Sequence, residues 1–171
     1  MHCEIKKVEP KDVTMLRKVS IKTFRETYEE DYQPHLFNQY LEEELSIEKL
    51  TEEIQNPNSI FYFIVYQAHI AGYFKMNIED AQTEPFSSEY VELQRLYLFK
   101  QYQGLKLGQF AFEQAIQIAK TLNKKRLWLG VWSENTSAIA FYKKQGLIKV
   151  GEHAFKVGEQ VDIDWMMELR L

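Results

Sequence analysis

Two periodicities in the apolar positions divide the chain into predicted helices and strands. Apolar residues recur every three or four positions in residues 13–28, 46–55, 107–122 and 135–145, which predicts amphipathic helices. Runs rich in β-branched and aromatic residues predict strands at residues 5–8, 60–66, 70–78, 89–98, 126–132, 147–155 and 160–170. Residues 67–69 join the second and third runs as a hairpin. The predicted order is therefore β-α-α-β-β-β-α-β-α-β-β.

This order predicts one domain of the α/β class, in the α+β sense, over residues 1–171. A chain of 171 residues with 45% hydrophobic residues is large enough for one substantial core. No repeat, low-complexity stretch or Pro/Gly-rich linker divides it. We expect a mixed sheet of about seven strands flanked by helices.

The strand predicted at residues 89–98 changes the phase of its alternation. Val91 and Leu93 alternate in one phase, whereas Leu96 and Leu98 alternate in the other. One inserted residue explains the change, and such an insertion is a β-bulge, which redirects backbone groups next to functional sites. A strand buried on both faces explains the same pattern without a bulge. The pattern alone does not separate the two interpretations.

Charge and composition exclude several classes of function. Lys and Arg total 21 and Asp and Glu total 25, which gives a net charge of −4 and no basic footprint for nucleic acid. The apolar runs are far shorter than a membrane span, and residues 1–6 lack the apolar core of a signal peptide. The single cysteine, Cys3, has no partner for an internal disulfide. We therefore expect a cytoplasmic protein that contacts neither nucleic acid nor membrane.

The same composition bears on ligands. A mildly acidic surface is ordinary for a soluble protein, and it also suits a small cationic substrate. No metal site is predicted, because the histidines lack the spacing of metal ligands. They are His2, His35, His69 and His153.

The most informative segment, residues 93–109, runs from the phase-shifted strand into the next helix through a short polar turn. The first backbone N–H groups of a helix have no intrahelical partner, so this turn suits an anion such as a pyrophosphate. Gly104 and Gly108 by themselves are weak evidence, because this spacing also occurs in ordinary loops. Gln109 follows Gly108 where a Walker A motif has Lys and then Ser or Thr, so an ATPase is not supported.

Several segments together resemble the GNAT family of N-acetyltransferases. That family has Gln-x-x-Gly-x-Gly/Ala at the start of a helix, a following strand, and then Asn-x-x-Ala-x-x-Phe-Tyr-x-x-x-Gly. The corresponding positions here are residues 103–108, the strand at 126–132, and Asn135, Ala138, Phe141, Tyr142 and Gly146. Residues 70–73, 80–82 and 127–132 are also similar to bacterial spermidine/spermine acetyltransferases of this family. The resemblance implies a bulged fourth strand that splays from the fifth, in a mostly antiparallel sheet.

The resemblance also implies acetyl-CoA as co-substrate, with its pyrophosphate on the turn and its pantetheine arm along the bulged strand. The implied coenzyme-binding residues are Leu96, Tyr97, Leu98, Gln103, Gly104, Leu105, Lys106, Leu107, Gly108, Gln109 and Asn135. Lys106 departs from the pattern, because the family has its first glycine there. Either the lysine adds a charge-assisted contact to phosphate, or it crowds the turn.

Tyr142 has two interpretations. Its periodicity with Ala138 and Phe141 is typical of a core tyrosine. In the family, however, the tyrosine of this motif lies close to the coenzyme sulfur and protonates the departing thiolate. A phenol with a pKa of about 10 stays protonated at neutral pH and suits that role.

Glu92 is the candidate general base. A primary amine with a pKa of about 10.4 is almost wholly protonated at neutral pH, so its proton must be accepted before it attacks. Glu92 matches the acidic position that serves related polyamine acetyltransferases as base, through ordered water. An exposed strand glutamate is the competing interpretation.

The expected activity is transfer of an acetyl group from acetyl-CoA to a primary amine of a small polyamine such as spermidine or spermine. Direct attack in a ternary complex is the mechanism that the resemblance implies. The alternatives are a protein, amino-acid or drug amine as acceptor, or a non-catalytic acyl-CoA-binding sensor. Dimers are common in the family, so a homodimer is a further expectation, although no interface stripe is evident in the sequence.

Overall fold

Residues 2–171 are described by the computed structural model, except for the side chains of residues 155 and 157. In that part of the chain one seven-stranded sheet has the order β1-β2-β3-β4-β5-β7-β6. The strands are β1 (Cys3–Lys7), β2 (Ser59–Tyr66), β3 (His69–Asn77), β4 (Tyr90–Leu98), β5 (Arg126–Trp132), β6 (Ile148–Val157) and β7 (Gln160–Arg170). All neighbouring pairs are antiparallel except β4 and β5, which are parallel. The predicted mixed, mostly antiparallel sheet is confirmed.

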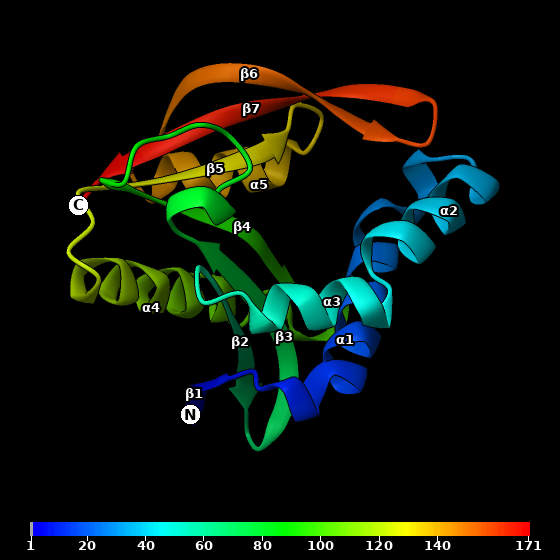
Figure 1. Cartoon of the computed structure of the whole chain (residues 1–171), viewed down its shortest axis with the longest axis horizontal. Coiled ribbons are helices and arrows are strands. Elements are labelled where there is room, and N and C mark those ends of the chain that lie inside the picture. The colour runs from blue at the N-terminus through cyan, green and yellow to red at the C-terminus, as the bar shows by residue number, and fades with distance from the viewer. Residues whose placement is uncertain (1) are drawn as a thin grey trace.

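Helices cover both faces of this sheet (Figure 1). The helices are α1 (Val13–Tyr28), α2 (Pro34–Glu44), α3 (Ile47–Gln55), α4 (Leu107–Thr121) and α5 (Thr136–Lys144). Helices α1, α2 and α3 pack on one face through Leu16, Phe37 and Leu50, which are at most 1% exposed. Helices α4 and α5 pack on the opposite face through residues such as Phe112 and Ile139.

Helix α2 was not predicted. Its first residue is Pro34, which is tolerated in the first turn of a helix because its N–H would lack a partner there in any case. Only Phe37 and Leu41 are buried along its 11 residues. Its apolar positions at residues 36, 37, 40 and 41 have helical spacing but span less than two turns, so tertiary packing rather than a sustained sequence pattern identifies this helix.

Strand β4 contains the predicted bulge. Lys75 of β3 pairs with Arg95, and the next residue, Met76, pairs with Leu93. Gln94 is therefore the inserted residue, and the interpretation of a regular strand buried on both faces is wrong.

Beyond the bulge, β4 separates from β5. These strands pair only from Tyr90↔Arg126 to Glu92↔Trp128, whereas β4 stays paired with β3 as far as Leu98↔Gly72. A side chain at Gly72 would meet the Tyr97 carbonyl oxygen 2.1 Å from its Cβ, so glycine is required for this close approach. The β5-facing edge of residues 96–98 is thus left without a strand partner.

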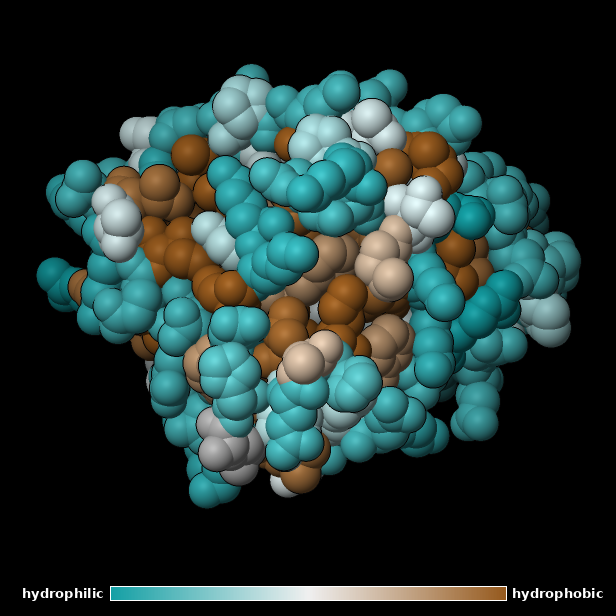
Figure 2. All heavy atoms as spheres, turned by 90° about the horizontal axis from the view of Figure 1, so that it is seen from below, coloured by the Kyte–Doolittle hydropathy of each residue, from teal (hydrophilic) through white to brown (hydrophobic). Residues whose placement is uncertain are grey.

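The surface seen from below Figure 1 carries apolar residues near its centre, framed by polar ones (Figure 2). Such a surrounded apolar area is commonly associated with binding. No helix in residues 2–171 is long and apolar enough to cross a membrane.

Candidate active site

A cavity of about 1040 Å³ opens where β4 and β5 separate. Its walls come from the end of α1, the bulged half of β4, the turn before α4, the end of β5, and α5. The lining residues from the α1 end, β4 and the turn that leads into α4 are Glu26, Thr27, Tyr28, Asp31, Leu93, Gln94, Leu96, Tyr97, Leu98, Gln103, Gly104, Lys106, Leu107, Gly108 and Gln109. Those of β5 and the α5 region are Gly130, Val131, Trp132, Glu134, Asn135, Thr136, Ser137, Ala138, Phe141, Tyr142, Lys144 and Gln145.

The turn before α4 exposes backbone donors to this cavity. The first helical hydrogen bond runs from the Phe110 amide to the Lys106 carbonyl, 3.1 Å away. The amides of Leu107, Gly108 and Gln109 therefore precede the helical hydrogen-bond ladder. Together with the partial positive charge of the helix N-terminus they favour an anion.

Lys106 and Gly104 give the turn its shape. Both have positive φ, 62° and 81° respectively, in the left-handed region. A lysine is strained there, whereas a glycine is not. The left-handed conformation explains in physical terms why the motif favours glycine at the position of Lys106. Its exposed side chain makes no capping hydrogen bond and borders the cavity.

Most of the predicted coenzyme-binding residues lie together around the cavity. From β4, Leu96, Tyr97 and Leu98 border it with the backbone edge that β5 leaves unpaired. Of the seven turn residues, only Leu105 is not among the lining residues, and its side chain is 38% exposed.

Asn135 lies across the cavity from β4. Its Oδ1 accepts a hydrogen bond of 3.2 Å from the Ala138 amide, so Asn135 is the N-cap of α5. This contact fixes the start of the helix that carries Tyr142.

Tyr142 borders the cavity and packs against Phe112 and Phe141, with ring centroids 6.0 and 5.3 Å away. Burial raises the pKa of the Tyr142 phenol above its usual value, and nearby Tyr28 adds to the shift. The phenol is therefore protonated throughout the neutral range, as a proton donor must be. Tyr142 is thus packed like a core tyrosine and also borders the cavity, and its role as a proton donor stays a prediction.

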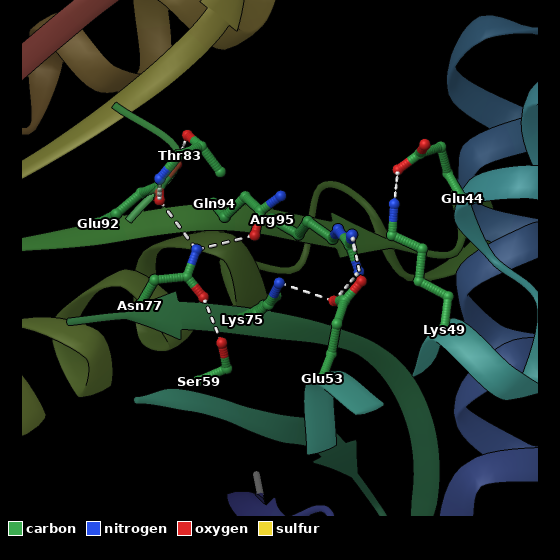
Figure 3. A network of polar contacts seen from close by, with 10 residues as sticks. All are labelled: Glu44, Lys49, Glu53, Ser59, Lys75, Asn77, Thr83, Glu92, Gln94 and Arg95. Carbon is green, nitrogen blue, oxygen red and sulfur yellow. Dashed lines mark hydrogen bonds and ion pairs between the residues drawn. The ribbon is translucent and has the colours of Figure 1, made fainter. Parts of the chain in front are cut away.

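Glu92 lies outside the cavity lining. It is 2% exposed, so it is not the exposed strand glutamate of the competing interpretation. Its carboxylate accepts hydrogen bonds from Asn77 Nδ2 (2.9 Å) and from the amide and hydroxyl of Thr83 (2.8 and 2.6 Å) (Figure 3). Asn77 Nδ2 also donates to Oε1 of the bulge residue Gln94, 2.8 Å away. The network therefore ties Glu92 to the bulge and to the loop before β4.

An ion cluster fixes the other side of the bulge. The Glu53 carboxylate of α3 lies 2.7 Å from Lys75 Nζ and 3.2 Å from Arg95 Nη1 (Figure 3). Burial lowers the pKa of Lys75 to about 8, and the neighbouring Arg95 acts in the same direction. Glu53 offsets both effects and holds α3 on the bulged strand.

Tyr28 and Trp132, which the sequence did not single out, form the end of the cavity near α1 together with the predicted Tyr97. The hydroxyls of Tyr28 and Tyr97 are 3.4 Å apart, and Tyr28 packs edge-on against Trp132, with centroids 6.0 Å apart. Burial raises the pKa of Tyr28. In the sequence Tyr28 and Trp132 are indistinguishable from ordinary core aromatics, because only the separation of β4 and β5 exposes them to a cavity.

No group of three or more His, Cys, Asp or Glu side chains within residues 2–171 is arranged to hold a metal ion. The polar side chains that line the cavity include hydroxyls, side-chain amides, carboxylates and two lysines.

Comparisons with known proteins agree with this geometry. The family model described as Acetyltransferase (GNAT) family matches residues 21–147. An N-acetyltransferase of the pepI 3' region in Lactobacillus delbrueckii subsp. lactis is 35% identical over 168 residues, covering 98% of this chain and 97% of the relative. The spermidine N(1)-acetyltransferase of Thermoplasma acidophilum is 27% identical over 172 residues, covering 98% and 97%.

A similar fold is seen in the crystal structure of the PaiA N-acetyltransferase from Thermoplasma acidophilum in complex with coenzyme A. The TM-score is 0.80 at 24% identity, with 100% of both chains covered. Because the family match spans most of the chain, and the bulge, the cleft and the anion-binding turn all coincide with the sequence motifs, the chain belongs to the GNAT family of acetyl-CoA-dependent N-acetyltransferases.

Proposed function

We propose that this acetyltransferase acetylates a primary amine of a small polyamine, such as spermidine or spermine, within a ternary complex. The observation that carries the proposal is a single continuous cavity. It runs from the anion-binding turn, past the unpaired edge of β4, to an end near α1 that contains Glu26, Asp31 and aromatic side chains. One cavity can thus hold a phosphate-bearing donor and a cationic acceptor side by side.

The residues present fit the proposed coenzyme. The amides of residues 107–109, in the first turn of α4, are free to donate to a diphosphate, and the open edge of residues 96–98 offers hydrogen-bonding groups to an extended arm. When bound, acetyl-CoA supplies the thioester that the amine attacks. We assign Leu96, Tyr97, Leu98, Asn135 and the turn residues 103–109 to coenzyme binding.

Tyr142 is proposed as the acid that donates its hydroxyl proton to the departing sulfur. It is neutral at physiological pH, and the N-capped helix α5 fixes its position. The Glu92 carboxylate stays a candidate for accepting the amine proton, with Thr83 or a water as the link, because it does not itself border the cavity.

Polyamines are favoured because carboxylates border the acceptor end, and because a spermidine N(1)-acetyltransferase is similar to this chain over nearly its whole length. Aromatic faces such as those of Tyr28 and Trp132 also attract ammonium groups.

Coenzyme A release, followed by a thiol reagent, tests the proposal with spermidine, spermine, amino acids, aminoglycosides and peptides bearing a free amine. We expect turnover with spermidine or spermine at a kcat/KM at least ~10-fold above that for the other amines. Preferential turnover of another acceptor would overturn the polyamine assignment. Acetyl-CoA binding without thiol release for any amine would overturn the catalytic role and favour a sensor.

A further inference from the structure

A second polar cluster adjoins the cavity across the backbone of β5. Gly130, which borders the cavity, is the second residue beyond the last β4–β5 pair. A Cβ at this glycine would lie 3.3 Å from His153 Cε1 and 3.5 Å from Asp164 Oδ2. The absence of a side chain at Gly130 therefore lets both groups approach the point where the cleft opens.

Three segments build this cluster. His153 on β6 and Asp164 on β7 are cross-strand partners, and Glu84 comes from the loop before β4. His153 Nε2 lies 3.7 Å from Asp164 Oδ2, and His153 Nδ1 lies 3.4 Å from Glu84 Oε1. All three side chains are largely buried, with exposed fractions of 25%, 14% and 30% for His153, Asp164 and Glu84.

Two nitrogen atoms in this region lack a hydrogen-bond partner among the described residues. They are His153 Nδ1 and Trp132 Nε1, and both atoms are buried. Trp132 of β5 borders the cavity, and Asp164 of the intervening strand β7 pairs with both Trp132 and His153. Buried polar atoms in native proteins are almost always satisfied, so unpaired ones beside a cavity indicate where a ligand binds.

Charge favours a cation at the same place. Burial raises the pKa of Asp164 to about 6, while His153 acts to lower it and Asp162 to raise it. Asp162 is itself held by a 3.0 Å hydrogen bond from the Tyr32 hydroxyl, and Tyr28 of α1 also interacts with Asp164. Among the described residues, the groups that interact with His153 and Asp164 are thus carboxylates and neutral phenols.

Building on the proposed function, we infer that His153, in place of the hydrogen-bonded Glu92, is the group that deprotonates the acceptor amine. Asp164 is its positioning residue, and Glu84 is the ammonium-binding residue. Nε2–H of a neutral imidazole points to Asp164, which leaves the Nδ1 lone pair free. Nδ1 and Glu84 Oε1 are then two acceptors 3.4 Å apart that converge on one N–H donor. This tautomer is assigned from the arrangement of the partners.

The proton step balances within this cluster. One N–H bond of the ammonium breaks, its proton moves to His153 Nδ1 directly or through one water, and the freed lone pair attacks the thioester carbonyl. The resulting imidazolium lies between two carboxylates, which stabilise it. The proton lost from the amine is thereby kept close to the site.

The pH dependence of kcat/KM for spermidine, measured by thiol release, tests the inference. His153→Gln should lower kcat/KM by ~10²-fold or more and flatten the acidic limb of the profile, while the Kd of acetyl-CoA changes less than ~3-fold. Asp164→Asn should move the acidic limb, and Glu84→Gln should act mainly on KM for the amine. The matched control is His69→Gln, an exposed histidine at the β2–β3 turn, which should leave the profile unchanged.

A His153→Gln enzyme that binds acetyl-CoA normally and retains the wild-type acidic limb would overturn the inference. The proposed function would still stand in that case, provided that the wild-type enzyme turns over spermidine. The absence of turnover in the wild type with every amine would instead overturn the proposed function. If His153→Gln does not fold, Glu84→Gln decides, because an unchanged KM for the amine in that variant would contradict the cluster's role.

Discussion

At the scale of single residues, the side chains proposed for the chemistry differ in their access to the cavity. Tyr142 and Tyr28 both border the cavity, whereas Glu92 is enclosed by hydrogen bonds and Asp164 adjoins the cavity behind Gly130. Sequence motifs pointed to Tyr142 and Glu92 as candidates. Whether a side chain is buried and whether it reaches the cavity depend on residues distant in the chain, so the motifs alone did not settle a catalytic role.

Tyr142→Phe removes the hydroxyl and keeps the ring that packs against Phe112 and Phe141. Turnover should fall by ~10²-fold or more, because the departing thiolate loses its proton donor, and the Kd of acetyl-CoA should stay within ~3-fold. Steady-state thiol release and isothermal titration calorimetry measure the two quantities. Equal turnover in variant and wild type would remove Tyr142 from the acid role.

Asp164→Asn should change how stability depends on pH. The pKa of Asp164 is raised from 3.8 to about 6 in the folded state, so its contribution to stability is fully present below pH 3.8 and is lost as pH rises through 6. The variant should therefore gain stability relative to the wild type between pH 4 and 7, by roughly 1–2 kcal/mol. Urea unfolding of variant and wild type at pH 4 and at pH 7 measures the difference in unfolding free energy. The same difference at both pH values would contradict the raised pKa of Asp164.

At the scale of elements, the sequence predicted those whose pattern is local. The phase change in β4 indicated its bulge, and the turn before α4 was identified from its motif. Helix α2 was missed because its apolar positions span less than two turns, and only Phe37 and Leu41 among them are buried. The cluster around His153 was also missed, because its members come from three segments that meet only through the β6–β7 register. Alternation along β7, with Asp162 and Asp164 on one face, was the available signal.

Lys106→Gly tests the strained turn. Glycine adopts the left-handed conformation without strain, so the folded state should gain up to ~1 kcal/mol. We expect acetyl-CoA affinity to fall at the same time, and its salt dependence to weaken, because the ammonium at the cavity edge is lost. Thermal unfolding and binding titrations at two salt concentrations measure both effects. A rise in affinity would show instead that the lysine crowds the turn.

Glu53→Ala tests how α3 supports the bulged strand. The change leaves Lys75 and Arg95 buried without their carboxylate, so unfolding free energy should drop by ~3–5 kcal/mol. Glu44→Ala, which removes a partly exposed pair with Lys49, is the matched control and should cost less than ~1 kcal/mol. Similar losses in the two variants, measured by urea unfolding, would contradict a special role for the buried cluster.

At the scale of the whole molecule, one sheet places the two proposed ligand environments on its opposite sides. Helices α4 and α5 cover one face and present the anion-binding turn and Tyr142, while α1 and the loop before β4 cover the other face near the carboxylates. The separation of β4 from β5 connects the two sides through a single cavity. The fold was predictable from element order, whereas this connection depends on where strand pairing ends.

The most direct test of the account is a crystal structure of the protein bound to acetyl-CoA. We predict the diphosphate on the amides of the turn at residues 103–109, the pantetheine arm between residues 96–98 and Asn135, and the sulfur within hydrogen-bonding distance of the Tyr142 hydroxyl. A ligand bound elsewhere, or β4 and β5 paired along their whole length, would contradict it.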